Sequence, residues 1–291
     1  MAVYEHSYKP YVGPMTPNWS RLAVIPRHMF GAIFQSKLFT GFYAFCFACP
    51  LVMAVLVYLK HNLNALKILN LNAADVLQIN NSFFLAYCSF QFTMAFLVTV
   101  IIGPILISRD LTNNALPLYL SRPFSRPEYV LGKASVLGIL LSAITWAPGL
   151  ALFIFQSCLE GWGWLTANLW MIAAIVVASL VWITILTLLA MSVSAWIKWR
   201  IGASAIIFGL FLIPSAVATF INALFKTGWG SLISISQVLS DATRGLFREP
   251  PVRIFDFNPA PLAADWAVLI VTAAVCLWVL SLKIKAYEIS Q

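Results

Sequence analysis

The sequence predicts an all-α integral membrane protein with six transmembrane helices, and three observations lead to this fold class. Hydrophobic residues make up 61% of the 291 positions and charged residues 10%, with a mean hydropathy of +0.88, which is outside the range of soluble domains. Six long runs contain no Asp, Glu, Lys or Arg. The chain lacks the regular apolar and polar alternation that is typical of outer-membrane barrel strands.

The whole chain is interpreted as one transmembrane domain. A helix needs about 20 apolar residues to cross the hydrocarbon core. The predicted spans are 39–59, 83–107, 134–159, 168–195, 201–225 and 263–282, where the charge-free part of the last run begins at Trp266. The connecting regions are a tail at 1–38, a loop at 108–133 and a loop at 226–262. Six spans place both termini on the same side of the membrane.

The residues just before span one predict an amphipathic helix. Apolar residues recur there at helical spacing, and among them are the aromatic Trp19, Phe30 and Phe34. Arg21 and Arg27 lie on the opposite face. This pattern is typical of a basic helix that lies in the membrane interface, and Pro26 marks its start or a kink. The alternative is a juxtamembrane stretch that only tethers the chain.

The distribution of charge predicts the orientation. With the N-terminus inside, the inner segments hold twelve basic and four acidic residues, and the outer segments hold six of each. Basic residues in short loops resist translocation, so the N-terminus, the C-terminus and the 108–133 loop are expected in the cytoplasm. The whole net charge of +8 then lies on the inner side of the membrane, and a nucleic-acid partner is not needed to explain it.

Polar residues and prolines inside the spans are few. Pro50, Pro104, Pro148 and Pro214 each remove a backbone donor and permit a kink. Small polar side chains such as Gln91 are expected to form hydrogen bonds between helices, and the alternative is that some of them face a substrate path.

The outer loop at 226–262 carries an apolar stripe that includes Leu239 and Ala242. The stripe favours a surface helix over the outer end of the spans, and a loop without structure is the alternative. Asp265 follows this loop near the start of span six. We interpret it as a carboxylate that caps the helix N-terminus, with a role in transport as the alternative.

Catalytic and metal-binding patterns are largely missing from the sequence. Cys46 and Cys49 have the spacing of a metal or redox pair, but no second pair or histidine lies nearby, so packing is the favoured interpretation. Gly132 and Lys133 resemble the end of a phosphate-binding loop, but Pro127 denies that loop its backbone freedom. The chain is therefore expected to be no enzyme and to bind no cofactor of its own.

The loop at 108–133 has more internal pattern than the other loops. Leucines from Leu111 to Leu120 suit a short packing helix, and two prolines stiffen the turn that follows. Ser125 and Glu128 have the spacing of a capping box, which predicts that the third helix begins in the cytoplasm, well before its apolar run. The alternative is an inert connector with a well-capped helix.

This loop resembles that of the membrane subunits of ATP-binding cassette (ABC) exporters of type 2. Those permeases typically have an acidic residue after span two, a coupling helix, a leucine-rich stretch, a Ser-x-Pro-x-Ser-Arg motif and then Gly-Lys. The corresponding elements here are Asp110, Leu116 to Leu120, Ser121 to Arg126 and Gly132-Lys133. Asn113-Asn114-Ala115 stands where the family often has Gly-Thr. The six spans and the helix before span one extend the resemblance over most of the chain.

The resemblance implies a dimeric permease, homomeric or heteromeric, in the cell inner (plasma) membrane. A separate cytoplasmic ATPase that holds ATP and magnesium would dock on the coupling helix and its flanks. The docking residues implied are Arg109, Asp110, Leu116, Leu118, Tyr119, Arg122 and Arg126. The alternative function is a membrane scaffold or assembly subunit of an envelope or respiratory complex.

Overall fold

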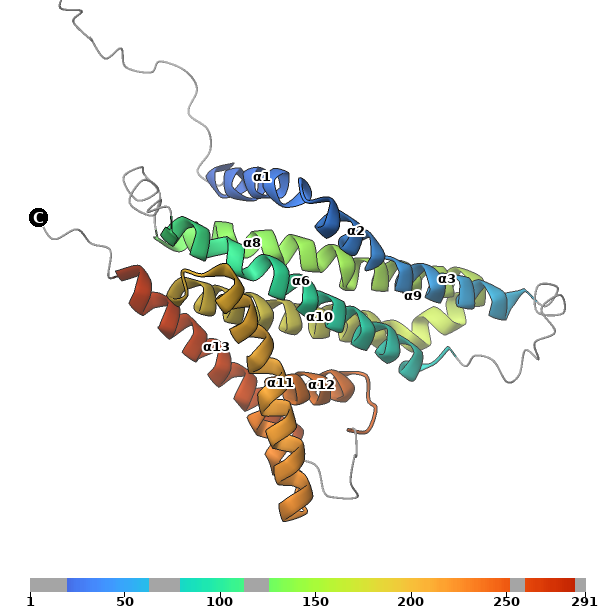
Figure 1. Ribbon diagram of the computed structural model, residues 1–291. Helices are drawn as coiled ribbons and strands as arrows, with labels where there is room; N and C mark the ends of the chain where they lie inside the picture. Colours follow the sequence, from blue (N-terminus) through green and yellow to red (C-terminus); the bar gives the residue numbers. More distant parts are fainter. Residues whose placement is uncertain (1–19, 63–78, 113–125, 252–259, 286–291) are drawn as a thin grey trace, which may run out of the picture.

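The computed structural model describes residues 20–62, 79–112, 126–251 and 260–285. Within these ranges the chain is helical and contains no strand. Six of its helical segments are long and apolar enough to cross a membrane. Most of them run along one bundle, with α1 (Ser20–Phe34) beside one end (Figure 1). We call this the α1 end, and the opposite end the far end.

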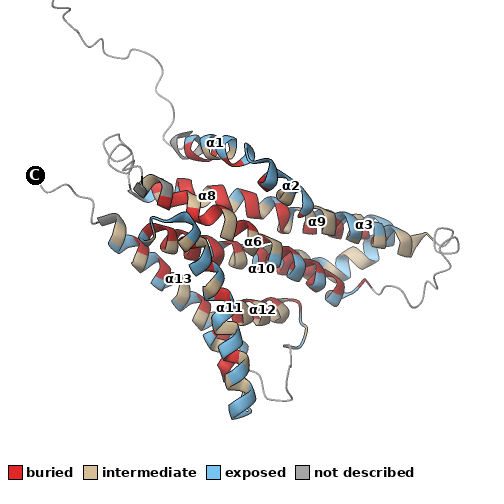
Figure 2. Cartoon of the chain, in the orientation of Figure 1, coloured by how far each residue is buried: buried red, intermediate tan, exposed pale blue. Residues whose placement is uncertain are grey.

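The six segments correspond to the six predicted spans. They are α2 and α3 (Lys37–Phe45 and Ala48–His61), α6 (Asn81–Thr112), α8 and α9 (Arg126–Ile144 and Trp146–Glu160), α10 (Trp162–Trp196), α11 (Arg200–Phe225) and α13 (Leu262–Lys285). The second, third and fourth segments are the most buried, and the first, fifth and sixth present most of their surface outward (Figure 2). In a bilayer the outward side chains meet lipid.

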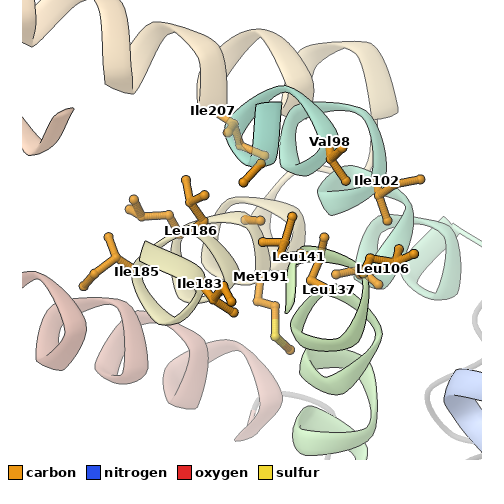
Figure 3. Close-up of a cluster of buried hydrophobic side chains, with 14 of the residues drawn as sticks. Val98, Ile102, Leu106, Leu137, Leu141, Ile183, Ile185, Leu186, Met191 and Ile207 are labelled. Carbon is orange, nitrogen blue, oxygen red and sulfur yellow. The ribbon is translucent and has the colours of Figure 1, made fainter. Parts of the chain in front are cut away.

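The centre of the bundle is an apolar contact between α6, α8, α10 and α11. Figure 3 shows side chains from these four helices pointing toward one another, among them Ile102, Leu141, Leu186 and Ile207. Gly103 allows α6 to approach α10 closely, since a Cβ there would lie 2.7 Å from the Cβ of Ala190. This contact holds the middle of the fold together.

Span one is broken into two helices, and the break explains one of its prolines. Pro50 lies in the first turn of α3 and has no N–H, so it cannot bond to the carbonyl of Cys46 four residues earlier. Gln91 of α6 donates its Nε2 to that carbonyl at 3.0 Å. The expected interhelical bond of Gln91 is therefore present, and it satisfies a group that the proline leaves free.

Span three is also two helices, α8 and α9, joined at Thr145. Tyr87 of α6 donates its hydroxyl to the Thr145 carbonyl at 2.7 Å. A Cβ at Gly149 would lie 2.9 Å from the Tyr87 ring and 3.0 Å from Ile175, so only glycine fits beside the joint. Pro148 lies in the first turn of α9, where the missing N–H costs least.

Among the spans, prolines inside continuous helices occur at Pro104 of α6 and Pro214 of α11, and Pro26 lies inside α1 rather than at its start. The carbonyl that Pro104 leaves free belongs to Val100, and Ser204 of α11 donates its hydroxyl to it at 3.0 Å. The neighbouring helix thus takes the place of the missing backbone donor, as Gln91 does at the first break.

The segment after α11 folds back into the bundle. It comprises the short helix η1 (Trp229–Ile233) and α12 (Ile235–Leu246). Ser236 reaches the carbonyl of Phe211 near the middle of α11, at 3.5 Å. Thr243 accepts a hydrogen bond from Trp182 near the middle of α10, at 3.0 Å. The predicted helix is present, and it lies within the length of the bundle rather than over its end (Figure 1).

Candidate coupling site

The predicted docking loop has both of its flanks at the α1 end, where α6 ends and α8 begins. Asp110 on α6 and Lys133 on α8 form an ion pair there, with Oδ2 and Nζ 2.7 Å apart. The Lys133 side chain is 3% exposed and that of Asp110 is 14% exposed. Because water is largely excluded, each charge depends on the other for its solvation.

Tyr129 completes this cluster from the turn of α8 that precedes Lys133. Its hydroxyl donates to Asp110 Oδ2 at 2.7 Å, and its side chain is buried. The Lys133 Nζ lies 5.7 Å from the centre of the Tyr129 ring, within range of a cation–π attraction. Residues four apart lie on the same helix face, which places both side chains toward α6. The three residues join the two flanks of the loop.

Helix α1 packs on the same part of α8. A Cβ at Gly132 would lie 2.8 Å from Cδ1 of Ile25, so glycine lets the two helices approach closely. The Lys133 Nζ lies 3.4 Å from the sulfur of Met29. Ile25, Met29 and Ile33 recur every four residues and form the face of α1 that is turned inward. A displacement of α8 would therefore be felt by α1.

A side chain of α10 bonds to the α6 backbone just inside this cluster. The hydroxyl of Ser194 on α10 accepts from the backbone N–H groups of Ile107 at 3.2 Å and Ser108 at 3.0 Å. It also donates to the Pro104 carbonyl at 3.2 Å. A side chain that inserts into the backbone ladder is a recognised cause of helix bending. The last turns of α6 are thus attached to α10 as well as to their own helix.

The arrangement has a mechanical consequence. A force on the connection between Asp110 and Tyr129 acts on α6, α8 and α1 together, because buried polar contacts join all three. Removing one partner of a buried ion pair costs about 3–5 kcal/mol, so these ends move together rather than separately. The cluster is suited to transmit movement, and its groups are already bonded to one another.

The residues predicted for docking fall partly within the structure. Asp110 belongs to the cluster. Arg109 is in α6 and Arg126 begins α8, but their side chains lie outside the described parts. The remaining four also lie outside the described residues: Leu116, Leu118, Tyr119 and Arg122. Helix α8 is described from Arg126 with Glu128 in its first turn, and Ser125, the predicted partner of Glu128 in the capping box, lies outside the described residues.

The residues predicted for an interfacial helix belong mostly to α1. Arg27 is exposed, and Phe30 packs against the main apolar cluster. Phe34 is 39% exposed, and its ring centre lies 5.7 Å from those of both Phe39 and Tyr43 on α2. Trp19 lies outside the described residues, as does the side chain of Arg21.

The sequence-based site omitted Tyr129, Lys133, Met29 and Ser194. A signal for Lys133 was present, since a single lysine at the start of a long apolar helix needs an anion, and Asp110 is the acid at the end of the preceding helix. Ser194 had no such signal, because its role depends on where α10 meets α6. In comparisons with known proteins, no family model and no curated protein matches the chain.

Proposed function

We propose that the chain is the membrane-spanning permease subunit of an ATP-driven exporter of ABC type 2. It dimerises and forms the substrate path, and a separate cytoplasmic ATPase that carries ATP and magnesium drives it. The observation that carries the proposal is the buried cluster of Asp110, Tyr129 and Lys133, which connects both flanks of the predicted docking loop to α1. The resemblance of the 108–133 loop supports it independently.

In this proposal the α1 end is cytoplasmic and belongs to the cell inner membrane. The basic residues Lys37, Lys198, Arg200 and Lys283 lie near this end of the spans, in agreement with the positive-inside rule. Helix α1 lies in the inner interface, with its apolar face on α8 and Arg27 toward lipid headgroups. The 108–133 loop is the proposed docking surface for the ATPase.

The mechanism follows from the connections of the cluster. Closure of the ATPase pair on ATP would push the docking loop, and the Asp110–Lys133 pair would pass that movement to α6, α8 and α1. Helix α6 would bend where Ser194 enters its backbone, since hydrogen bonds there are shared with α10. The bend would open or close a path along α6, α11 and the first span.

The test is a single substitution in the docking loop. Leu118→Asp places a charge in an apolar contact with the ATPase, where an unpaired carboxylate costs several kcal/mol. A loss of about 3 kcal/mol is more than a hundredfold in affinity, so the ATPase should no longer copurify, while the permease inserts normally. Arg122→Glu should have a milder effect that depends on salt, as expected of a charge at the rim.

Lys226→Asp is the matched control, because it also adds negative charge but lies exposed at the far end. It should leave ATPase binding and coupled hydrolysis unchanged at equal membrane abundance. If Leu118→Asp retains full ATPase binding and hydrolysis, the loop is not the dock, and a scaffold role in an envelope or respiratory complex becomes the better proposal.

A further inference from the structure

Helix α12 has two different faces. Val238, Leu239, Ala242 and Thr243 are buried against the bundle. The other face is polar and half-buried, and consists of Ser236, Gln237, Ser240, Asp241 and Arg244. Gln237 on this face reaches the hydroxyl of Thr219 on α11 at 3.2 Å. A polar surface therefore lies within the length of the spans, where the sequence alone predicted almost none.

Asp265 lies beside this surface, and among the described residues no hydrogen-bond or ion-pair partner of its carboxyl group is found. It is in the first turn of α13 and only 3% exposed. Its Oδ1 is buried and makes no hydrogen bond. The expected capping bond to a backbone N–H is also not made within the described residues. A carboxyl group buried in this way carries a large desolvation cost unless something pairs with it.

Asp241 lies at the same level as Asp265. Helices α12 and α13 are in close contact at Gly245, where a Cβ would lie 2.7 Å from Cδ1 of Leu262. Asp241 is one turn before this contact on α12, and Asp265 is about one turn after it on α13. Because the two helices run in opposite directions here, the two carboxyl groups come near each other, and they interact electrostatically.

The two carboxyl groups carry more negative charge than the neighbouring Arg244 can balance. Burial raises the pKa of the Asp241 carboxyl to about 6, and Arg244 partly opposes that shift, so Asp241 is mostly ionised at neutral pH. The Arg244 guanidinium donates to the Pro250 carbonyl at 3.4 Å and forms no ion pair with either carboxylate. Within the parts of α12 and α13 that the structure describes, one arginine beside two carboxyl groups leaves an excess negative charge.

The surroundings favour an organic cation over a metal ion. Metal ions such as calcium require several oxygen ligands, and in the described residues no group of three His, Cys, Asp or Glu could hold one. Leu262 is 43% exposed and lies on the same face of α13 as Asp265. A ligand with an apolar body and one positive charge would match both the carboxyl groups and this leucine.

We propose that Asp241 and Asp265 form a binding site for hydrophobic organic cations on the far half of the transport path. The proposal rests on the permease function, and it names the substrate class of that permease. The orphaned carboxyl group of Asp265 would be paired when the cation is bound, and Arg244 would remain beside the site.

The experiment measures binding of tetraphenylphosphonium to the full-length chain in lipid nanodiscs by equilibrium dialysis. Tetraphenylborate has nearly the same size and shape but the opposite charge, and serves as the matched probe. Wild type should show saturable phosphonium binding, which Asp241→Asn and Asp265→Asn should each weaken at least tenfold. Tetraphenylborate binding should not weaken in either variant.

Glu249→Gln is the control variant, because Glu249 is another carboxylate at the far end but is bonded to Ser82 at 2.8 Å. It should bind phosphonium like wild type. Thermal unfolding of each variant shows whether it is folded, and Asp241 is only half-buried, so its substitution should be well tolerated. Equal phosphonium affinity in all variants overturns the proposal, as does competition by sodium that is as strong as that by unlabelled phosphonium.

The two proposals fail in different ways. Phosphonium binding is measured without an ATPase, so it tests the cation site alone. If the chain binds phosphonium but no ATPase docks on the 108–133 loop, the cation site stands and the ATP-driven function is refuted. If an ATPase docks but phosphonium binding is not selective for charge, the ATP-driven function stands and the cation site is refuted.

Discussion

At the scale of single residues, polar groups in this protein are placed to satisfy one another across helices. Asp110, Tyr129 and Lys133 form a cluster with its own donors and acceptors at the α1 end. Asp265 differs, because its buried Oδ1 has no hydrogen-bond partner. The Asp110 cluster is suited to a structural connection between helices, and the Asp265 carboxyl group is suited to pair with a bound cation, as proposed.

A substitution at Lys133 tests the connection. Lys133→Met removes the cation and leaves the Asp110 carboxylate largely buried, so the free energy of unfolding should fall by about 3–5 kcal/mol. The double variant with Asp110→Asn should recover much of this loss, because no unpaired charge remains. Arg27→Met, at an exposed position of α1, should change little. Denaturant unfolding in detergent measures the stability of all these variants. A double variant no more stable than Lys133→Met would show that the unpaired Asp110 carboxylate is not the cause of the lost stability.

At the scale of helices, two breaks and one proline in the spans are supported by neighbours. Gln91 donates a hydrogen bond to the Cys46 carbonyl, Ser204 donates one to the Val100 carbonyl, and Tyr87 donates one to the Thr145 carbonyl at the joint of span three. Membrane helices can contain proline only if the freed backbone groups are satisfied, because no water reaches them. The prolines were visible in the sequence, but their partners come from helices distant in the chain.

A pair of substitutions tests whether Gln91 acts by bonding to the carbonyl that Pro50 leaves free. Gln91→Leu should destabilise the fold by about 1–3 kcal/mol, since it leaves the Cys46 carbonyl without its donor. Pro50→Ala restores a backbone N–H that can bond to the same carbonyl. Gln91→Leu should therefore cost clearly less in the Pro50→Ala background than in wild type, as measured by unfolding in detergent. An equal cost in both backgrounds would show that Gln91 acts through something else.

At the scale of the whole molecule, the helices divide into a buried group and an outer group. The second, third and fourth spans are buried on many sides, and α11 and α13 expose apolar side chains such as Ile213 and Trp278. The exposed positions are suited to lipid or to a second copy of the chain. The α1 end collects basic residues, which supports the proposed orientation.

Labelling at two exposed lysines tests that orientation. In a background without the five native cysteines, Lys226→Cys at the far end should react with a membrane-impermeant maleimide added to intact cells. Lys198→Cys, in the corner between α10 and α11, should react only after the membrane is opened. Labelling of Lys198→Cys in intact cells would reverse the proposed topology.

The sequence by itself determined the number and approximate bounds of the spans, because crossing a membrane demands about 20 apolar residues in a row and that demand is local. It also indicated a helix before span one, where α1 lies. Only the tertiary structure decided that Lys133 meets Asp110, that Ser194 enters the backbone of α6 and that α12 returns into the bundle to bring Asp241 near Asp265. These contacts join residues from different helices, and their energies depend on distances that local hydrophobicity does not encode.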